Sequence, residues 1–283
     1  MAIGSMGGRL HPMYTPGQRG GSGRPTGVPV LVTPFESPVS AFWDDFMFPA
    51  TRAMPGWVFA QPAGTTGIRV DNAEDAGAPV GILRLQTGTT SGNSACVDLL
   101  TSDGSSSVRK TVLFLAGTPT PGERALAAFR FRSVNAGNAS TSARGVGLVS
   151  SDLAVATDWW SDPDVILAAT PGLVVTRHTS AYSGDATGDL VFRWYDGVTA
   201  PPVSITLLAA ASFSAGTWYD VELVQSGTTV NVLLNGALKG SFTPDASASM
   251  YLSPSAGIAT TSGAARQLDV DFFYTENKLV AAR

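Results

Sequence analysis

The chain has 283 residues, of which 44% are hydrophobic and 14% are charged, and its net charge is −4. A single cysteine, Cys96, excludes an internal disulfide framework and a CxxC metal or redox motif. The chain has no basic stripe of the kind that binds nucleic acid. No segment approaches the roughly 20 apolar residues that span a membrane, and the first residues lack the apolar core of a signal peptide. The composition predicts a soluble protein that binds neither nucleic acid nor a membrane.

The first 40 residues differ from the rest of the chain in composition and charge. They are rich in Gly and Pro, and they offer too little apolar surface to offset the entropy of ordering. Residues 1–35 contain Arg9, Arg19 and Arg24 and no acidic residue. Subtracting this charge of +3 from the net −4 leaves −7 for the remaining residues. We therefore predict an extended anchoring arm over residues 1–40 and one folded domain over residues 41–283.

The stretch over residues 217–242 predicts three consecutive antiparallel strands. Residues 219–223 alternate apolar and polar side chains, as in a strand with one buried face. Ser226-Gly227 then turns the chain, and a second alternating segment follows. Asn235-Gly236 is the pair that most readily forms a tight hairpin turn before the third strand. This stretch therefore predicts a β-meander.

Short alternating segments occur through most of the chain, at the spacing of a β-sandwich. The further strand candidates are residues 42–46, 80–86, 108–115, 127–131, 144–150, 173–177, 190–194, 203–208 and 268–272. Cys96 lies between two apolar residues and is expected in a buried strand. Residues 125–128 leave room for a helical turn. The pattern predicts an all-β protein, a two-sheet antiparallel sandwich without a long helix.

Pairs of carboxylates are the first candidates for general acid and base catalysis. They are Asp269 and Asp271 with Glu276, the acids Asp158, Asp162 and Asp164 of one loop, and Asp44 with Asp45. Asp269 and Asp271 share one face of a strand and can point together at a ligand. The stronger interpretation places both at solvent-facing positions of an edge or outer-face strand.

The loop that contains Trp159 and Trp160 is a candidate for binding. Asp158, Asp162 and Asp164 can coordinate calcium, and the two tryptophans can stack on sugar rings. Against this, the spacing matches no calcium-loop motif, and paired tryptophans more often clamp a loop to the core. We therefore predict no cofactor. Calcium, and a glycan site built from Asp158, Trp159, Trp160 and Asp162, are the alternatives.

The two histidines, His11 in the arm and His178 at the end of an apolar strand, argue against a histidine metal site or a Ser-His-Asp triad. The sequence has no GxSxG, phosphate-cradling loop or HExxH motif. His178 is interpreted as a loop or surface residue. We therefore predict that the protein is not an enzyme.

Four segments, in their order along the chain, resemble the concanavalin A-like jelly roll, including laminin-G-like modules. They are Gly145–Leu148, Thr217–Val221, Val232–Gly236 and Leu268–Phe272. In that fold a strand of the form W-y-x-v-x-v pairs with a v-x-v-y-v-N-G hairpin, and the chain closes with a strand of the form i-D-x-f. The resemblance covers roughly residues 41–276 and implies a jelly-roll sandwich.

The start of the predicted domain also resembles structural proteins of tailed bacteriophages that carry this fold. The likeness lies in Asp44-Asp45-Phe46, Trp57 and the segment Gly81–Thr89. Glycosidases of the family carry an E-x-D-x-x-E run or a similar acid run on a concave strand, and this chain has none. Lectin-like members bind sugar through loops with calcium, Asn and aromatic residues. The resemblance therefore implies a rigid virion building block rather than an enzyme.

The leading hypothesis is a bacteriophage virion protein, most specifically a capsid decoration or cement protein that is assembled in the host cytoplasm. Residues 1–40 would fasten it through main-chain hydrogen bonds and arginine contacts. The expected partners are other virion proteins, capsid or tail subunits, and copies of itself. The second hypothesis is a tail-fibre or baseplate adhesin whose jelly roll binds a host surface glycan, and the third is a glycoside hydrolase.

Overall fold

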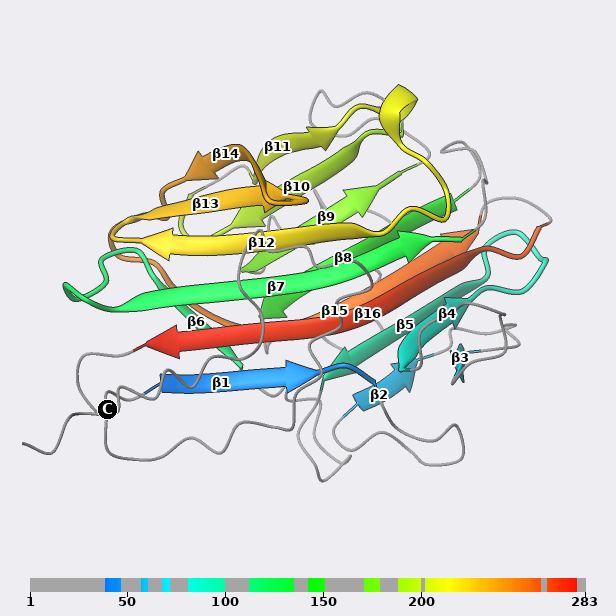
Figure 1. Ribbon diagram of the computed structural model, residues 1–283, viewed down its shortest axis with the longest axis horizontal. Helices are drawn as coiled ribbons and strands as arrows, with labels where there is room; N and C mark the ends of the chain where they lie inside the picture. Colours follow the sequence, from blue (N-terminus) through cyan, green and yellow to red (C-terminus); the bar gives the residue numbers. More distant parts are fainter. Residues whose placement is uncertain are drawn as a thin grey trace, which may run out of the picture.

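The computed structural model describes residues 39–46, 57–60, 68–71, 81–99, 112–134, 142–150, 171–178, 188–199, 202–260 and 264–278. These residues form two antiparallel sheets that pack face to face as a sandwich (Figure 1). Within the described ranges there is no α-helix, and the helical element is the short 3-10 turn η2 (Ala210–Ser212). The predicted all-β, two-sheet fold is confirmed.

Each sheet has eight described strands. Sheet A runs β14 (Ala237–Phe242), β13 (Thr229–Leu234), β12 (Tyr219–Ser226), β7 (Arg124–Ser133), β16 (Gln267–Lys278), β4 (Ile82–Gln86) and β3 (Ile68–Asp71), and β1 (Val39–Asp44) also pairs with β16. Sheet B runs β11 (Val203–Leu208), β10 (Leu190–Tyr195), β9 (Gly172–Arg177), β8 (Ser142–Ser150), β15 (Ser249–Thr260), β5 (Ser94–Leu99) and β2 (Trp57–Ala60), and β6 (Leu113–Ala116) also pairs with β15. Sequence-distant strands are therefore neighbours in both sheets.

The predicted meander is confirmed as β12, β13 and β14, at one edge of sheet A. Its two turns use residues that tolerate a positive φ: Gly227 has φ 58°, Asn235 has φ 54° and Gly236 has φ 76°. Tyr219, Val221 and Leu223 are buried on the inner face of β12, as their alternation predicts. Local alternation and turn chemistry are thus sufficient to place this edge.

The core lies between the sheets. It is built from the side chains of each strand that point inward, which alternate with side chains that point outward. An aromatic group of Phe46, Trp57 and Phe273 ties the first strands to the last, with ring centroids 5.3–6.3 Å apart. Phe46, the last residue of the strand candidate at 42–46, is fully buried in this core. Cys96 is also fully buried in β5, as predicted.

The closing strand, β16, is longer and more central than residues 268–272 predict. It pairs with β1, β4 and β7, and its register with β7 shifts between Val270 and Phe272. Leu268 and Val270 face the core before this bulge, and Phe273 faces it afterwards. Asp271 and Phe272 consequently both lie on the outer face, where Phe272 stacks on Trp43 with centroids 5.2 Å apart.

Strand β15 lies at the centre of sheet B and was not predicted, because its sequence SMYLSPSAGIAT contains Pro and Gly. Proline is normally excluded from central strands, since it cannot donate to the ladder. Pro254 is accommodated because only β8 pairs with it: on the other side β6 pairs with Ser249–Leu252 and β5 with Ser255–Ala259. The proline therefore lies at the gap between two short partner strands.

The helical turn allowed at residues 125–128 is wrong, because these residues lie inside β7 between β12 and β16. Strands β2 and β3 were also not predicted, whereas the candidates at 80–86, 144–150, 173–177, 190–194 and 203–208 correspond to strands. Of the candidate at 108–115, the described part is β6. Residues 1–38 of the predicted arm lie outside the described residues, and its last two residues, Val39 and Ser40, lie in β1.

Candidate functional site

The outer face of sheet A carries the acids that the sequence offers as catalytic candidates. Asp269 is fully buried, and its two oxygens accept hydrogen bonds from Arg84 at 2.9 and 3.1 Å and from Arg132 at 2.9 Å. Asp269 lies on the outer face, one of the two predicted alternatives, but its expected solvent exposure is wrong, because Arg84 and Arg132 of the neighbouring strands β4 and β7 bind it there. A carboxylate held by two guanidinium groups is a structural ion pair and not a free base.

The other two acids of β16 are paired as well. Asp271 is buried, which also corrects its expected solvent-facing place, and it lies 3.4 Å from Arg130. Glu276 accepts from Arg124 at 2.6 Å and from the Tyr274 hydroxyl at 2.7 Å. Burial, followed by this bond to Glu276, raises the pKa of Tyr274 above its usual range. Asp269, Asp271 and Glu276 thus tie β16 to its neighbours.

Trp218 completes this face beside the start of β12. The guanidinium carbons of Arg132 and Arg130 lie 4.6 and 5.6 Å from its ring centroid, within the range of a cation–π contact. Arg130 also lies 3.0 Å from Asp220. The arginines therefore have ring and carboxylate partners at the same time, and the face forms a connected network across β4, β16, β7 and β12.

Asp44 is a further acidic candidate in the described ranges. Its hydrogen bonds hold the start of the sandwich together. Its Oδ1 accepts from the Phe46 N–H at 2.8 Å and its Oδ2 accepts from Trp57 Nε1 at 2.6 Å. Burial raises the pKa of Asp44, although both hydrogen bonds oppose the shift. This carboxylate joins β1 to β2, and both of its oxygens accept hydrogen bonds that stabilise the fold.

The outer face of sheet B carries a buried row of five residues, three of them polar, that the sequence does not reveal. In register, the row runs Asp98, Ser255, Gly147, Val174 and Arg193 across β5, β15, β8, β9 and β10. The Ser255 hydroxyl donates to Asp98, and Arg193 donates to Thr176. All of these side chains are at most 2% exposed. Hydrogen bonds thus hold the polar side chains at the two ends of the row, and Gly147 and Val174 lie between them.

His178 follows β9 on this side of sheet B, and only 4% of it is exposed. The expectation of a surface histidine is therefore wrong, although its place just after a strand is as predicted. Burial, followed by the charge of Arg193, lowers the pKa of His178 to about 3. His178 is neutral at physiological pH, which argues for a packing role.

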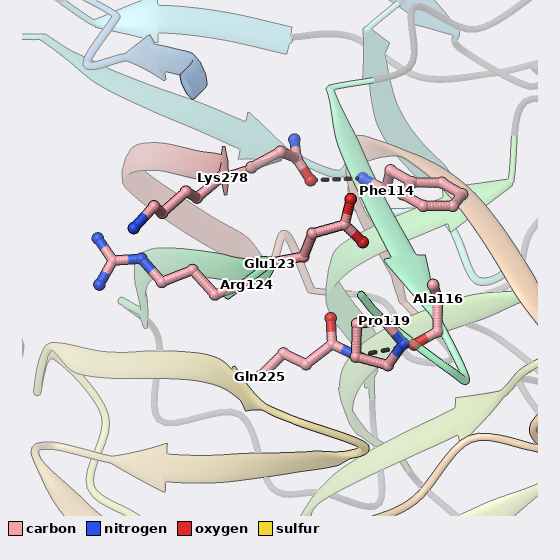
Figure 2. Close-up of a pocket in the computed structure, with 8 residues that line it drawn as sticks. Phe114, Ala116, Pro119, Glu123, Arg124, Gln225 and Lys278 are labelled. Atoms are coloured by element: carbon pink, nitrogen blue, oxygen red, sulfur yellow. Dashed lines mark hydrogen bonds between the residues drawn. The ribbon is translucent and has the colours of Figure 1, made fainter. Parts of the chain in front are cut away.

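A small hollow lies at the corner where β6 meets the ends of β7 and β16 (Figure 2). It occupies about 220 Å³ including open solvent, and its lining includes Glu123, Arg124, Gln225 and Lys278. Gln225 Nε2 donates to the Ala116 carbonyl at 2.8 Å. Figure 2 shows the Phe114 ring directed away from the other lining side chains. The hollow combines the apolar residues Ala116 and Pro119 with charged and amide side chains, and the Phe114 ring does not point into it for stacking.

The Phe114 ring instead packs against Tyr251 on the outer side of sheet B. The two residues are directly opposite each other in β6 and β15, and their ring centroids are 4.9 Å apart at 43°. Half of the Tyr251 surface is exposed, whereas Met250 and Leu252 on either side are fully buried. This pair is an exposed aromatic surface held by a regular strand pair, and sequence reasoning missed it because β15 was not predicted.

The predicted binding residues lie outside the described part of the chain. They are Asp158, Trp159, Trp160, Asp162 and Asp164 of the loop and Arg9, Arg19 and Arg24 of the arm. Within the described ranges no group of three metal-ligating side chains is present, and no helix there is long and apolar enough to cross a membrane. The calcium, glycan and anchoring assignments of these residues remain predictions.

No family model and no curated protein matches the chain. Among solved structures, it is similar to peanut lectin with a nine-residue peptide, with a TM-score of 0.54 and 11% identity over 87% of this chain and 100% of that chain. The basic winged bean lectin with Tn-antigen gives a TM-score of 0.52 and 10% identity over 86% and 100%. A point mutant of the Emp46p carbohydrate recognition domain gives 0.50 and 8% over 83% and 97%. These likenesses show that the chain has the concanavalin A-like lectin fold.

Proposed function

We propose that the chain is a structural protein of a tailed-bacteriophage virion whose jelly roll recognises a glycan without cleaving it. The observation that carries the glycan part is the exposed Tyr251 ring, supported by Phe114, on a sandwich of the lectin fold. The apolar C–H face of a sugar packs well on an aromatic ring. A few polar groups around such a ring then give orientation and specificity.

The proposal of recognition without hydrolysis is supported by the state of the acidic side chains. Glycoside hydrolysis needs two carboxyl groups across a cleft, about 5–5.5 Å apart for retention or about 6.5–9.5 Å apart for inversion. Asp269, Glu276 and Asp98 are each bound to arginine or hydroxyl partners of the fold. None of these three is placed to protonate a leaving group or to activate water.

The virion part of the proposal is supported by the sequence resemblance at Asp44-Asp45-Phe46 and Gly81–Thr89 and by the basic arm. Arg9, Arg19 and Arg24 give the arm a charge opposite to that of the rest of the chain, which suits docking on an acidic protein surface. In this arrangement the arm attaches the protein to the particle and the sandwich is displayed. The most specific form of the proposal is a tail-fibre or baseplate adhesin.

Two substitutions of Tyr251 test the glycan surface. Soluble oligosaccharides from the bacterial surface would be titrated into the full-length protein, and intrinsic fluorescence or heat would be recorded. Tyr251→Ala is expected to weaken binding at least tenfold, because it removes the stacking ring, whereas Tyr251→Phe keeps the ring and most of the affinity. Equal binding by wild type and Tyr251→Ala would remove this surface from the proposal. The loop with Trp159 and Trp160 would then be tested in the same way.

The second candidate function is a capsid decoration or cement protein, and the low charge of the chain favours it. Charged residues make up 14% of the sequence, about half the usual share, and a neutral surface suits packing against a protein shell. The test is rebinding to particles stripped of the protein. Restored resistance of those particles to heat, with no affinity for any glycan, would favour this candidate over the adhesin.

A further inference from the structure

One row of directly opposed side chains crosses the outer face of sheet A. Directly opposed residues of antiparallel strands point to the same face. The strands β12, β7, β16 and β1 lie side by side in Figure 1. In β13, β12, β7, β16 and β1, the row consists of Leu233, Glu222, Ala128, Tyr274 and Trp43. Glu222 is therefore the single acid in a row that is otherwise apolar or aromatic.

The apolar part of this face is a small cluster on sheet A alone. Ala128, Phe272 and Tyr274 form the cluster, and the described apolar side chains that pack against it are Trp43 and Leu126. These two belong to β1 and β7 of the same sheet. Within the described ranges, the cluster therefore has no apolar partner from outside sheet A.

Glu222 lies beside this cluster as a buried acid. The residue is 2% exposed, and its Oε2 has no hydrogen-bond partner in the part of the chain that the structure describes. Buried charges in proteins are normally paired, and buried polar atoms are normally hydrogen-bonded. The carboxylate of Glu222 therefore marks a place for a cation.

The arginines of the same face are already bound to other acids. Four further acids described on this face each have an arginine within 3.4 Å. They are Asp220 with Arg130, Asp269 with Arg84 and Arg132, Asp271 with Arg130, and Glu276 with Arg124. The cation for Glu222 is therefore not one of these arginines.

The segment before β1 has both the charge and the position to supply this cation. Residues 1–38 lead into Val39, and β1 then brings Trp43 into the row of Glu222. From Val39 to Glu222 the distance is about 20 Å, four residues along a strand and three strands across, which about six extended residues span. Arg9, Arg19 and Arg24 all lie further than this from Val39 in the sequence, and residues 1–35 contain no acid. Each of the three arginines can reach Glu222.

We propose that residues 1–38 dock on the outer face of sheet A of their own chain, with an arginine of this segment bound to Glu222. A guanidinium group pairs with a carboxylate through two parallel hydrogen bonds, and the apolar run Val30–Val32 suits the cluster around Trp43. The short tether raises the local concentration of the segment, which favours it over the same segment of a second copy. The inference does not depend on glycan binding, because Tyr251 lies on the outer side of sheet B.

A spin label on the full-length protein tests the docking. Ser22→Cys places the label between Arg19 and Arg24, and Cys96 is fully buried and stays unlabelled. The label is expected to rotate at least about threefold more slowly than on a free chain terminus, and Glu222→Gln should restore fast rotation. Asp220→Asn is the matched control. It neutralises an acid of the same face that has its own arginine, so the label should stay slow.

Substitution of the arginines identifies the cation. A variant that combines Arg9→Gln, Arg19→Gln and Arg24→Gln is expected to free the label as Glu222→Gln does. Adding Glu222→Gln to this variant should change nothing further, because both remove the same ion pair. Dilution should leave the label slow, since a contact within one chain does not depend on concentration.

Four results would overturn the inference. The first is a fast label in the protein with Ser22→Cys alone, and the second is a slow label after Glu222→Gln or after removal of the three arginines. The third is equal release of the label by Asp220→Asn, which would show a general charge effect. The fourth is a label that becomes fast on dilution, which would assign the contact to a second copy.

Discussion

The side-chain amide of Asn277 hydrogen-bonds to the backbone of Phe114 in strand β6 and of Val112 just before it, as the backbone of a neighbouring strand would. Its Oδ1 accepts from the Phe114 N–H at 2.9 Å, and its Nδ2 donates to the Val112 carbonyl at 3.0 Å. Thr275 donates to the same carbonyl at 2.8 Å, and Gln225 donates to the Ala116 carbonyl at 2.8 Å. Side chains of sheet A thus hydrogen-bond to the backbone groups along the edge of β6. This is the short strand of sheet B that supports Tyr251. This edge is closed without another strand.

Replacing Asn277 with Ala is expected to destabilise the fold by about 1–3 kcal/mol, because it removes the acceptor of the part-buried Phe114 N–H. The free energy of unfolding from urea titration is the measurement. Lys278→Ala, one position further along β16, is the control and should change stability by less than about 0.5 kcal/mol. Equal effects of the two substitutions would show that the amide does not act as a strand mimic.

Asp269→Asn is expected to cost about 3–5 kcal/mol, since it leaves the buried Arg84 and the part-buried Arg132 beside a neutral group. Asp220→Asn is the matched control. The carboxylate of Asp220 is about one-fifth exposed, so its loss should cost below about 1 kcal/mol. Both values come from chemical unfolding at neutral pH. An Asp269→Asn protein as stable as wild type would mean that the network is dispensable.

The buried His178 makes stability depend on pH. The unfolded chain protonates this histidine near pH 6.5, whereas the folded protein takes up the proton only near pH 3, the lowered pKa of His178. Between these values the unfolded state binds more protons, so stability falls as pH falls, by up to about 1.4 kcal/mol per pH unit. Above pH 6.5 this loss is absent.

His178→Gln removes this titration, and unfolding curves at pH 4.5, 5.5 and 7 measure it. The stability difference between wild type and variant should shift in favour of the variant as pH falls. The comparison cancels other groups, such as Asp44, whose raised pKa acts in the opposite sense. A difference that is constant across this range would show that His178 is not neutral in the fold.

Deleting residues 1–38 separates attachment from recognition. The deletion ends before β1, which begins at Val39, so the sandwich and its glycan affinity should be unchanged. Binding to particles should be lost, because the basic arm is removed. Particle pull-down and sugar titration on the same preparation measure both properties. Retention on the particles after the deletion would assign attachment to the sandwich.

The strands and turns that depend on residues close together in the sequence could be predicted. Alternation and the Asn235-Gly236 turn are sufficient for β12 to β14. Arg130 and Arg132 are two residues apart, as are Asp269 and Asp271, so each pair lies on one face of its strand. This spacing is typical of a cross-strand ion network. The pairing itself was missed, because Asp269 lies 185 positions from Arg84 and 137 from Arg132. A chain segment does not show which distant strand becomes its neighbour.

The candidate glycan surface was hidden for a related reason. Tyr251 lies in β15, whose Pro254 and Gly257 contradict a central strand. The strand exists because β8 pairs with Leu252–Thr260 on one side while β5 and β6 divide the other side. Exposure of a single tyrosine then follows from tertiary packing. Sequence composition directed attention to Trp159 and Trp160 instead.

The most direct test of the central claim is to apply the full-length protein to an array of bacterial surface glycans and to assay every bound glycan for new reducing ends. The account predicts saturable binding to at least one glycan, lost in Tyr251→Ala, with no release of reducing ends. Release of reducing ends would show a hydrolase. Absence of binding to any glycan would contradict the recognition function and leave the decoration protein as the function to pursue.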